Sequence, residues 1–141
     1  MYKIKIYTVG KNKELWLDTA IEEYEKRLKS NFQFDWFFAK NDEGLKKLIE
    51  KEKHYIALDP LGYSLPSDEF SKLLYQQLLE NRSRLTFVIG GDEGLDISIK
   101  ANAYLLFSLS SMTFTHQITR LILTEQIYRA EQIQKGSPYH K

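Results

Sequence analysis

Two polar loops in the last third of the chain have residue types that suit a ligand site. Gly90-Gly91-Asp92-Glu93-Gly94 directly follows the apolar run Leu85–Ile89, and the polar turn Ser108–Thr113 follows a second apolar run, Ala103–Phe107. Apolar runs of this length are typical of buried strands. Ligands of open α/β sheets bind at the carboxyl ends of such strands. We therefore expect both loops to face one ligand.

The glycine-rich loop by itself allows three interpretations. Glycine tolerates positive φ, so the loop could be a simple turn between a strand and a helix. Glycine also lets backbone amides come close to a bound adenosine or methionine group, which is the interpretation we favour. The letters nearly match the signature loop of diguanylate cyclases as well, but those domains are longer and place the motif on a hairpin with a metal-binding carboxylate upstream.

The last residues carry a third set of chemically useful side chains. Gly136 and Pro138 predict the end of a long helix, and Tyr139, His140 and Lys141 follow. Chain ends are usually frayed and free to vary. Nevertheless this set suits a nucleotide, because a tyrosine can stack on a base, a histidine can hydrogen-bond or accept a proton, and a lysine can contact a phosphate.

Four motifs in order resemble one known family: IGGDEGL (Ile89–Leu95), LSSMTF (Leu109–Phe114), HQITRLILTEQIYRA (His116–Ala130) and the terminal YHK. They are similar to the RlmH family of SPOUT-class, S-adenosylmethionine-dependent methyltransferases, which act on a pseudouridine of large-subunit ribosomal RNA. Weaker similarity through Val9-Gly10-Lys11 and Tyr24–Arg27 extends the resemblance over the whole length. The chain departs from the family where Thr115-His116-Gln117 replaces a turn with proline, and where Phe38–Lys53 is short.

The resemblance implies the site residues. It implies that S-adenosylmethionine contacts Leu58, Gly90, Leu109, Ser110, Ser111, Met112, Thr113 and Phe114. For the implied methylation of pseudouridine N3 on the assembled ribosome, we place Tyr139, His140 and Arg120 in the catalytic set. His140 is the expected proton acceptor because the reference pKa of histidine, about 6.5, suits that role. Arg129, Tyr139, His140 and Lys141 would bind the RNA. His116 is expected to be only an N-terminal helix residue.

The upstream elements must position these loops. Alternation at Lys3–Val9, aromatic residues at Phe32–Phe38 and the apolar run His54–Asp59 predict three earlier strands. Helical spacing predicts helices over Leu17–Leu28, around Leu45–Ile49 and from Ser67. Alternating strands and helices predict an α/β fold, with a mainly parallel sheet and helices on both faces. The resemblance adds a SPOUT-type arrangement with a deep trefoil knot at the C-terminus.

The last helix, predicted over Phe114–Gln132, has two apolar stripes. Leu123, Ile127 and Ala130 form one, while Ile118, Leu121, Ile122 and Tyr128 form the other. Two stripes exceed what one sheet face can cover, so we expect a second packing partner. Symmetric dimers are the commonest soluble assemblies, and the family is dimeric, so a homodimer is the simplest interpretation. A charge at Leu123 or Ile127 is then expected to split it.

Composition limits the remaining possibilities. A chain of 141 residues is the size of one domain, which we place at residues 1–141. The absence of cysteine excludes disulfides and thiolate metal sites, so we expect no metal and a reducing, cytoplasmic setting. No stretch has the length and apolarity of a membrane span. With 20 basic and 19 acidic side chains, RNA affinity must be local rather than due to overall charge.

Two other functions remain open from the residues alone. The same strand ends could belong to a flavodoxin-like module that binds a nucleotide without chemistry. The chain could also be a factor that docks on the ribosome and has no catalytic activity. Cofactor titration separates these possibilities, since only a methyltransferase should bind S-adenosylmethionine.

Overall fold

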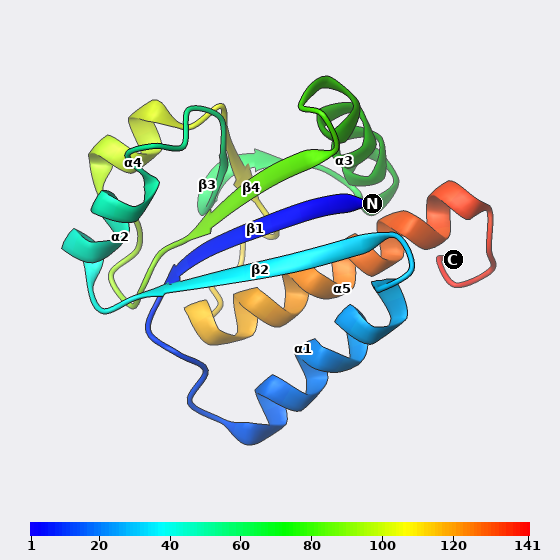
Figure 1. Cartoon of the computed structure of the whole chain (residues 1–141), viewed down its shortest axis with the longest axis horizontal. Helices are drawn as coiled ribbons and strands as arrows, with labels where there is room; N and C mark the ends of the chain where they lie inside the picture. Colours follow the sequence, from blue (N-terminus) through cyan, green and yellow to red (C-terminus); the bar gives the residue numbers. More distant parts are fainter.

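A computed structural model describes residues 1–141 as five parallel strands and five helices that alternate along the chain (Figure 1). The strands lie in the order β2-β1-β4-β3-β5. In chain order the elements are β1 (Tyr2–Val9), α1 (Leu15–Leu28), β2 (Phe32–Ala39), α2 (Asp42–Ile49), β3 (Ile56–Ser64), α3 (Ser67–Glu80), β4 (Arg84–Ile89), α4 (Ile97–Asn102), β5 (Leu105–Ser108) and α5 (His116–Lys135). The prediction of an α/β fold with a parallel sheet is confirmed.

Helices cover both faces of the sheet, but unequally. Side chains of α1, α3 and α5 pack on one face against Ile4, Ile6 and Phe87, which are almost completely buried. The opposite face carries only the short helices α2 and α4, which pack around Tyr7 and Val88. Side chains alternate between the faces along a strand. Ile4 and Ile6 therefore serve the larger core, whereas Lys3 and Lys5 point to the other face.

Two elements differ from the prediction. The third strand, predicted over His54–Asp59, runs instead from Ile56 to Ser64, and its pairing with β5 shifts register between Leu58 and Tyr63. Helix α4 was not predicted, because its six residues are too few to show a helical repeat. It is defined instead by its N-cap, where the Asp96 side chain accepts a hydrogen bond from the Ser98 amide at 2.9 Å.

The irregular part of β3 depends on Gly62. A Cβ atom at this position would lie 2.6 Å from the carbonyl carbon and oxygen of Leu106 in β5. Backbone atoms cannot move aside as a flexible side chain can, so only glycine fits this approach. The segment after Leu58 is thereby held close to β5, and both run toward the same edge of the sheet.

Helix α5 carries one of its two apolar stripes into the core of its own chain. Leu123, Ile127 and Ala130 are almost fully buried against the sheet and neighbouring helices. The expectation that a charge at Leu123 or Ile127 would act at a dimer interface is therefore wrong, because these residues are core residues of the monomer. Leu121 and Ile122, from the other stripe, are only half-buried. Although α5 is the longest helix, none of the helices combines the length and apolarity needed to cross a membrane.

The buried stripe leads to a prediction about stability. Leu123→Ala should lower the free energy of unfolding by about 2–5 kcal/mol, because it removes a fully buried side chain and leaves a cavity. Leu121→Ala, on the half-buried stripe of the same helix, is the matched control and should cost clearly less. Urea denaturation of both variants, followed by circular dichroism, measures the difference. Equal losses for the two variants would contradict this assignment of the stripes.

Candidate functional site

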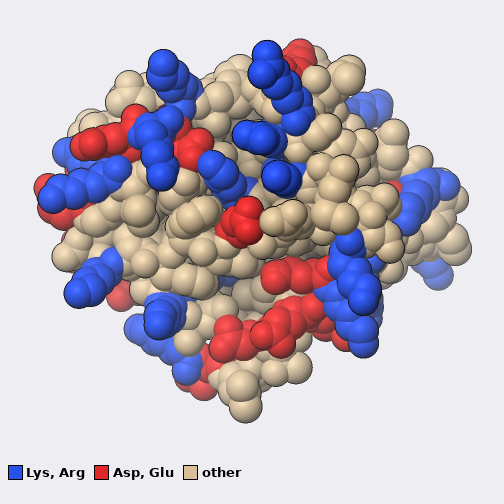
Figure 2. All heavy atoms as spheres, in the orientation of Figure 1, with Lys and Arg blue, Asp and Glu red and all other residues tan.

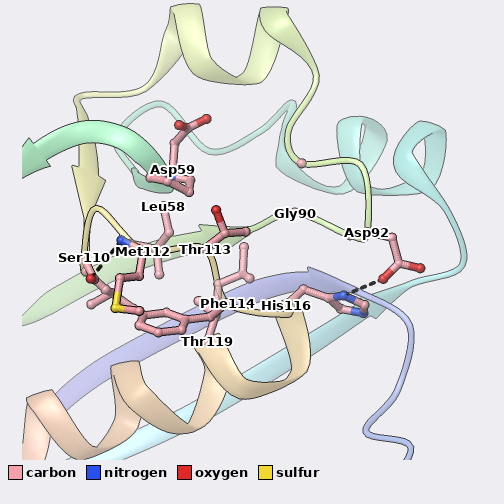
Figure 3. Close-up of a pocket in the computed structure, with 15 residues that line it drawn as sticks. Leu58, Asp59, Gly90, Asp92, Ser110, Met112, Thr113, Phe114, His116 and Thr119 are labelled. Carbon is pink, nitrogen blue, oxygen red and sulfur yellow. Dashed lines mark hydrogen bonds and ion pairs between the residues drawn. The ribbon is translucent and has the colours of Figure 1, made fainter.

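A pocket opens at the carboxyl edge of the sheet, where the two predicted loops meet (Figure 3). Leu58 lies in β3 just before its shift of register, and Gly90 directly follows β4. The segment after β5 closes the pocket with the first turn of α5. The lining residues are Leu58, Asp59, Pro60, Ile89, Gly90, Gly91, Asp92, Gly94, Leu109, Ser110, Met112, Thr113, Phe114, His116 and Thr119. None of them is a lysine or an arginine.

The glycine-rich loop is a tight turn with no space for side chains on its inner side. A Cβ atom at Gly90 would lie 2.7 Å from the Gly94 carbonyl group, and Gly94 itself has a φ of 82°. The turn is closed by a 3.0 Å hydrogen bond from the Gly94 amide to the Gly91 carbonyl. The loop then leads into α4, which is unlike the hairpin on which diguanylate cyclases carry their motif. Gly90, Gly91 and Gly94 all line the pocket, so this turn borders any molecule bound there.

The loop after β5 is held by its own serines. The hydroxyl group of the buried Ser108 donates to the Ser110 carbonyl at 2.8 Å, and the Ser110 hydroxyl accepts from the Met112 amide at 3.0 Å. Met112 and Phe114 remain 70% and 36% exposed, respectively. Large apolar side chains at the lip of a pocket can cover a flat ring without supplying charge, as an adenine requires.

Asp59 places a buried carboxylate at the pocket wall. Lys100 Nζ lies 2.8 Å from its Oδ2, and the Leu61 amide donates to its Oδ1 at 2.8 Å. Burial alone would raise the pKa of Asp59, but the hydrogen bonds from Lys100 and Leu61 outweigh burial and hold the pKa below its usual value. Asp59 is therefore ionised at neutral pH and fixed in position.

His116 forms part of the pocket, although the sequence favoured a purely local role. Its Nδ1 lies 3.0 Å from Oδ1 of the exposed Asp92, a distance typical of an ion pair, but the direction of approach does not make it a full hydrogen bond (Figure 3). Burial, followed by the nearby charge of Arg120, lowers the pKa of His116, and Asp92 offsets this only in part. The imidazole is consequently neutral at pH 7.

Arg120 does not reach the pocket. Its side chain is fully buried, and Nη2 donates to the carbonyl oxygens of Val9 and Gly10 at 2.7 and 2.8 Å. Nη1 donates to Oδ1 of Asn12 at 2.7 Å. Burial lowers the pKa of Arg120 to about 10, so the guanidinium stays charged at neutral pH. The structure gives Arg120 a positioning role between α5 and the end of β1, in place of the expected catalytic one.

The C-terminal residues fold back on α5, away from the pocket of the same chain. The Tyr139 hydroxyl donates to Glu125 Oε2 at 2.8 Å, and its ring lies 4.8 Å from both the Tyr128 ring centroid and the Arg129 guanidinium. Burial, with help from Glu125, raises the pKa of Tyr139, so its hydroxyl keeps its proton. The exposed Lys141 has no ion-pair partner in the chain.

His140 is restricted by its neighbour. Arg129 Nη1 lies 3.1 Å from His140 Nδ1. Because a guanidinium has no acceptor, Nδ1 must accept this hydrogen bond, and the hydrogen of a neutral ring then sits on Nε2. In this arrangement His140 can donate a hydrogen bond to a substrate through Nε2, which differs from the proton acceptor that the sequence suggested.

The structure divides the predicted residues into two groups. Seven of the eight predicted cofactor residues line one pocket, while the exposed Ser111 is not among the lining residues. Arg129, Tyr139, His140 and Lys141 form a separate group on α5 and the tail, and Arg120 belongs to neither. Sequence reasoning missed Asp59, Asp92, His116 and Thr119. Asp59 and Asp92 adjoin predicted residues in the sequence, and Thr119 lies one helical turn after His116. Their position in or next to the predicted loops was the signal that could have identified them.

Comparison with known proteins identifies the family. The family model described as "Predicted SPOUT methyltransferase" matches residues 2–140. A protein named Ribosomal RNA large subunit methyltransferase H from Protochlamydia amoebophila is 50% identical over 141 residues, covering 100% of both chains. The chain belongs to the RlmH family of SPOUT methyltransferases. A Streptococcus pyogenes relative with the same name is 41% identical over 158 residues, covering 99% of each chain.

A solved structure supports the fold of this RlmH-family chain. A probable methylase family protein from Haemophilus influenzae aligns with a TM-score of 0.57 over 99% of this chain and 70% of that one, at 8% identity. Membership in a methyltransferase family implies a methyl donor. No group of three or more His, Asp or Glu side chains that could hold a metal ion occurs in the structure.

The environment of His116 predicts a pH-dependent stability. Its pKa is lower in the folded chain than in the unfolded chain, so the unfolded state binds the extra proton first as the pH falls. Stability should therefore decrease as the pH drops below about 6.5, the reference pKa of histidine. His116→Gln should remove this part of the pH dependence. Urea unfolding between pH 5 and 8 provides the measurement, with His54→Gln as the control outside the pocket; identical curves for wild type and His116→Gln would refute it.

Proposed function

We propose that this protein transfers a methyl group from S-adenosylmethionine to N3 of a pseudouridine in 23S ribosomal RNA, on the assembled ribosome. The observation that carries the proposal is the charge of the pocket lining, which has no lysine or arginine and, besides Asp59 paired with Lys100, carries the exposed carboxylate of Asp92. Carboxylates favour a ligand with a sulfonium and an ammonium group. They disfavour the phosphates of FMN or a nucleoside triphosphate, which a flavodoxin-like module would bind. The names of the relatives at 50% and 41% identity supply the RNA.

The pocket residues fit this cofactor in shape as well. The turn at Gly90 presents backbone that no Cβ atom covers, and the loop Leu109–Phe114 offers backbone polar groups together with apolar side chains. Leu58, within β3, is 8% exposed, so only a small part of its side chain can contact the ligand. We assign Leu58, Gly90, Leu109, Ser110, Met112, Thr113 and Phe114 to the cofactor and Ser111 to the outer side of the loop.

The protein has little covalent chemistry to perform. When bound, the cofactor would supply a methyl carbon that is already electrophilic, so the residues must align N3 in line with it, and the N3 proton passes to solvent water. His140 Nε2 would donate to a carbonyl oxygen of the base and stabilise the negative charge that develops there. Arg129 holds the His140 ring in the required tautomer, and Lys141 is free to contact a phosphate of the RNA.

The separation of pocket and tail along α5 supports a second copy of the chain. His116 lines the pocket, whereas the tail contacts Glu125 and Arg129, which lie about 13–20 Å farther along the axis of α5 at 1.5 Å per residue. We therefore propose a homodimer in which the tail of one protomer completes the pocket of its partner. The half-buried Leu121 and Ile122, together with the exposed Leu15 and Trp16, supply apolar surface for the contact.

A knot in the C-terminal third is part of the same proposal. In a trefoil knot, the segment after β5 would pass through the loop that follows β3 before entering α5. The approach of Gly62 to the Leu106 backbone supports such a crossing, because it holds the β3 extension against β5. The crossing would also explain why residues from these two segments face each other in the pocket.

The reaction is tested with labelled cofactor. Wild-type protein incubated with ribosomes from a strain lacking the modification should transfer label to 23S RNA, with much less transfer to naked RNA or free subunits.

Gly90→Ala should reduce cofactor affinity at least tenfold, because the added methyl group collides with the Gly94 backbone. Gly44→Ala, where a Cβ atom has ordinary contacts, is the control. Absence of label in every RNA would refute the reaction, and heat of binding only with FMN or a nucleoside triphosphate would refute the cofactor.

The shared site predicts complementation between two inactive proteins. A chain lacking Tyr139–Lys141 should bind the cofactor normally but transfer no methyl groups, and Gly90→Ala should retain a normal tail. After the two are mixed under conditions that exchange subunits, mixed dimers contain one intact pocket facing one intact tail. Activity should then return to roughly a quarter of the wild-type level, from the random pairing of chains. No recovery, although mixed dimers are detected by mass spectrometry, would show that the tail does not act across the dimer.

A further inference from the structure

The amino-terminal half of one sheet face is left uncovered. Helices α2 and α4 have eight and six residues and pack near Tyr7 and Val88, toward the carboxyl ends of the strands. Farther back, the same face presents Lys3 and Lys5 of β1. The connection from α2 to β3 borders this area. Together they form a groove at the opposite end of the sheet from the cofactor pocket. The groove is lined by Lys3, Lys5, Asp35, Lys51, Glu52, Lys53, His54, Asn81, Arg84, Leu85 and Thr86.

Strand register places the charged side chains in rows. Lys3 is paired with Arg84 of β4, and Lys5 is paired with Thr86 on one side and Asp35 on the other. Paired residues of neighbouring parallel strands point to the same face, and the strands lie about 4.8 Å apart. Lys3 and Arg84 thus project side by side, although like charges repel. An anion bound between them would relieve that repulsion.

The groove is basic in a chain that is almost neutral. It contains five lysines or arginines and two carboxylates, whereas the whole chain has 20 basic and 19 acidic residues. Glu52 accepts from Lys5 Nζ at 3.1 Å and from the Tyr7 hydroxyl at 2.7 Å, so this pair is internally neutralised. Lys3, Lys51, Lys53 and Arg84 are exposed and form no ion pair within the chain.

The chemistry of the groove suits phosphodiester groups better than a protein surface. Leu85 is its only apolar lining residue, whereas specific protein interfaces have an apolar core. Figure 2 shows basic side chains gathered over β1 and β4 with few acidic ones among them. Several separated cations match the repeating charge of a nucleic-acid backbone, which contributes affinity without reading sequence.

We propose that this groove is a second RNA-binding surface, which holds the phosphate backbone of ribosomal RNA at a distance from the base being methylated. The inference rests on the proposed function for the identity of the RNA. Lys3, Lys53 and Arg84 carry the contact, with Lys51 at its margin. Since they lie at the opposite end of the sheet from the cofactor, they act on RNA affinity and leave cofactor binding unchanged.

The test compares two triple variants that remove the same charge. Lys3→Gln/Lys53→Gln/Arg84→Gln removes the surface, and Lys29→Gln/Lys47→Gln/Lys72→Gln changes three exposed lysines that form no ion pairs elsewhere. Each lost phosphate contact lowers the slope of log K against log salt by about 0.7–0.9, so three contacts should lower it by about 2–3. The KM for ribosomes should rise about tenfold at moderate salt. The kcat and the cofactor Kd should stay at the wild-type values.

Binding of a 23S RNA fragment without cofactor keeps this test separate from catalysis. If wild type methylates no RNA but the groove variant still loses RNA affinity and salt dependence, the proposed RNA-binding surface is supported and the proposed reaction is refuted. If wild type is active and both variants match it in KM and salt slope, the surface is overturned. Lys3→Arg/Lys53→Arg, which keeps the charges, should bind RNA as wild type does, and loss of binding there would contradict a phosphate contact.

A free phosphate compound is the other source of the same chemistry. Titration with inorganic pyrophosphate distinguishes the two sources. If pyrophosphate binds weakly and does not compete with RNA, the result supports a surface that binds the phosphate backbone of RNA. Tight pyrophosphate binding that the groove variant loses, together with unchanged RNA affinity, would assign the groove to a small ligand and overturn the proposal.

Discussion

The buried guanidinium of Arg120 is the contact on which the site depends. A charged group without water must have its hydrogen bonds satisfied by the protein, and Arg120 finds acceptors at Thr8, Val9, Gly10 and Asn12, just where β1 ends. These bonds fix the start of α5 against the carboxyl edge of the sheet. His116, one turn earlier on the same helix, and Thr119, the residue directly before Arg120, are thereby held at the pocket. A residue that looked catalytic in the sequence positions the site instead.

Much of the fold could be predicted because periodicity reports burial directly. Alternation at Lys3–Val9 and the apolar run Leu85–Ile89 correspond to β1 and β4, and seven of the eight residues that the family resemblance implied for the cofactor line one pocket. The remainder depends on contacts that no local pattern encodes. Strand order follows from packing of the whole chain, the continuation of β3 depends on Gly62 meeting Leu106, and the location of the tail depends on Glu125.

The C-terminal tail shows that the type of a residue and its position in the structure give different information about function. Tyr139, His140 and Lys141 have the chemistry that recognition of a base requires, and the sequence identified them for that reason. Their placement beside Glu125 and Arg129 separates them from the pocket of their own chain. Two half-sites at different points along one helix become a complete site only when two helices lie against each other. The second apolar stripe of α5 and the divided site thus have a common explanation in the proposed dimer.

Acidic and basic side chains also gather on different surfaces of the protein. The net charge of +1 is the sum of 20 basic and 19 acidic side chains, which are unevenly distributed over the surface. Glu22, Glu23 and Glu25 lie on α1, where Figure 2 shows acidic side chains gathered, whereas Lys3 and Arg84 stand over β1 and β4. Phosphates are attracted to the second surface and repelled by the first. On the proposed RNA substrate, the two surfaces together would favour one direction of approach by a nearly neutral protein.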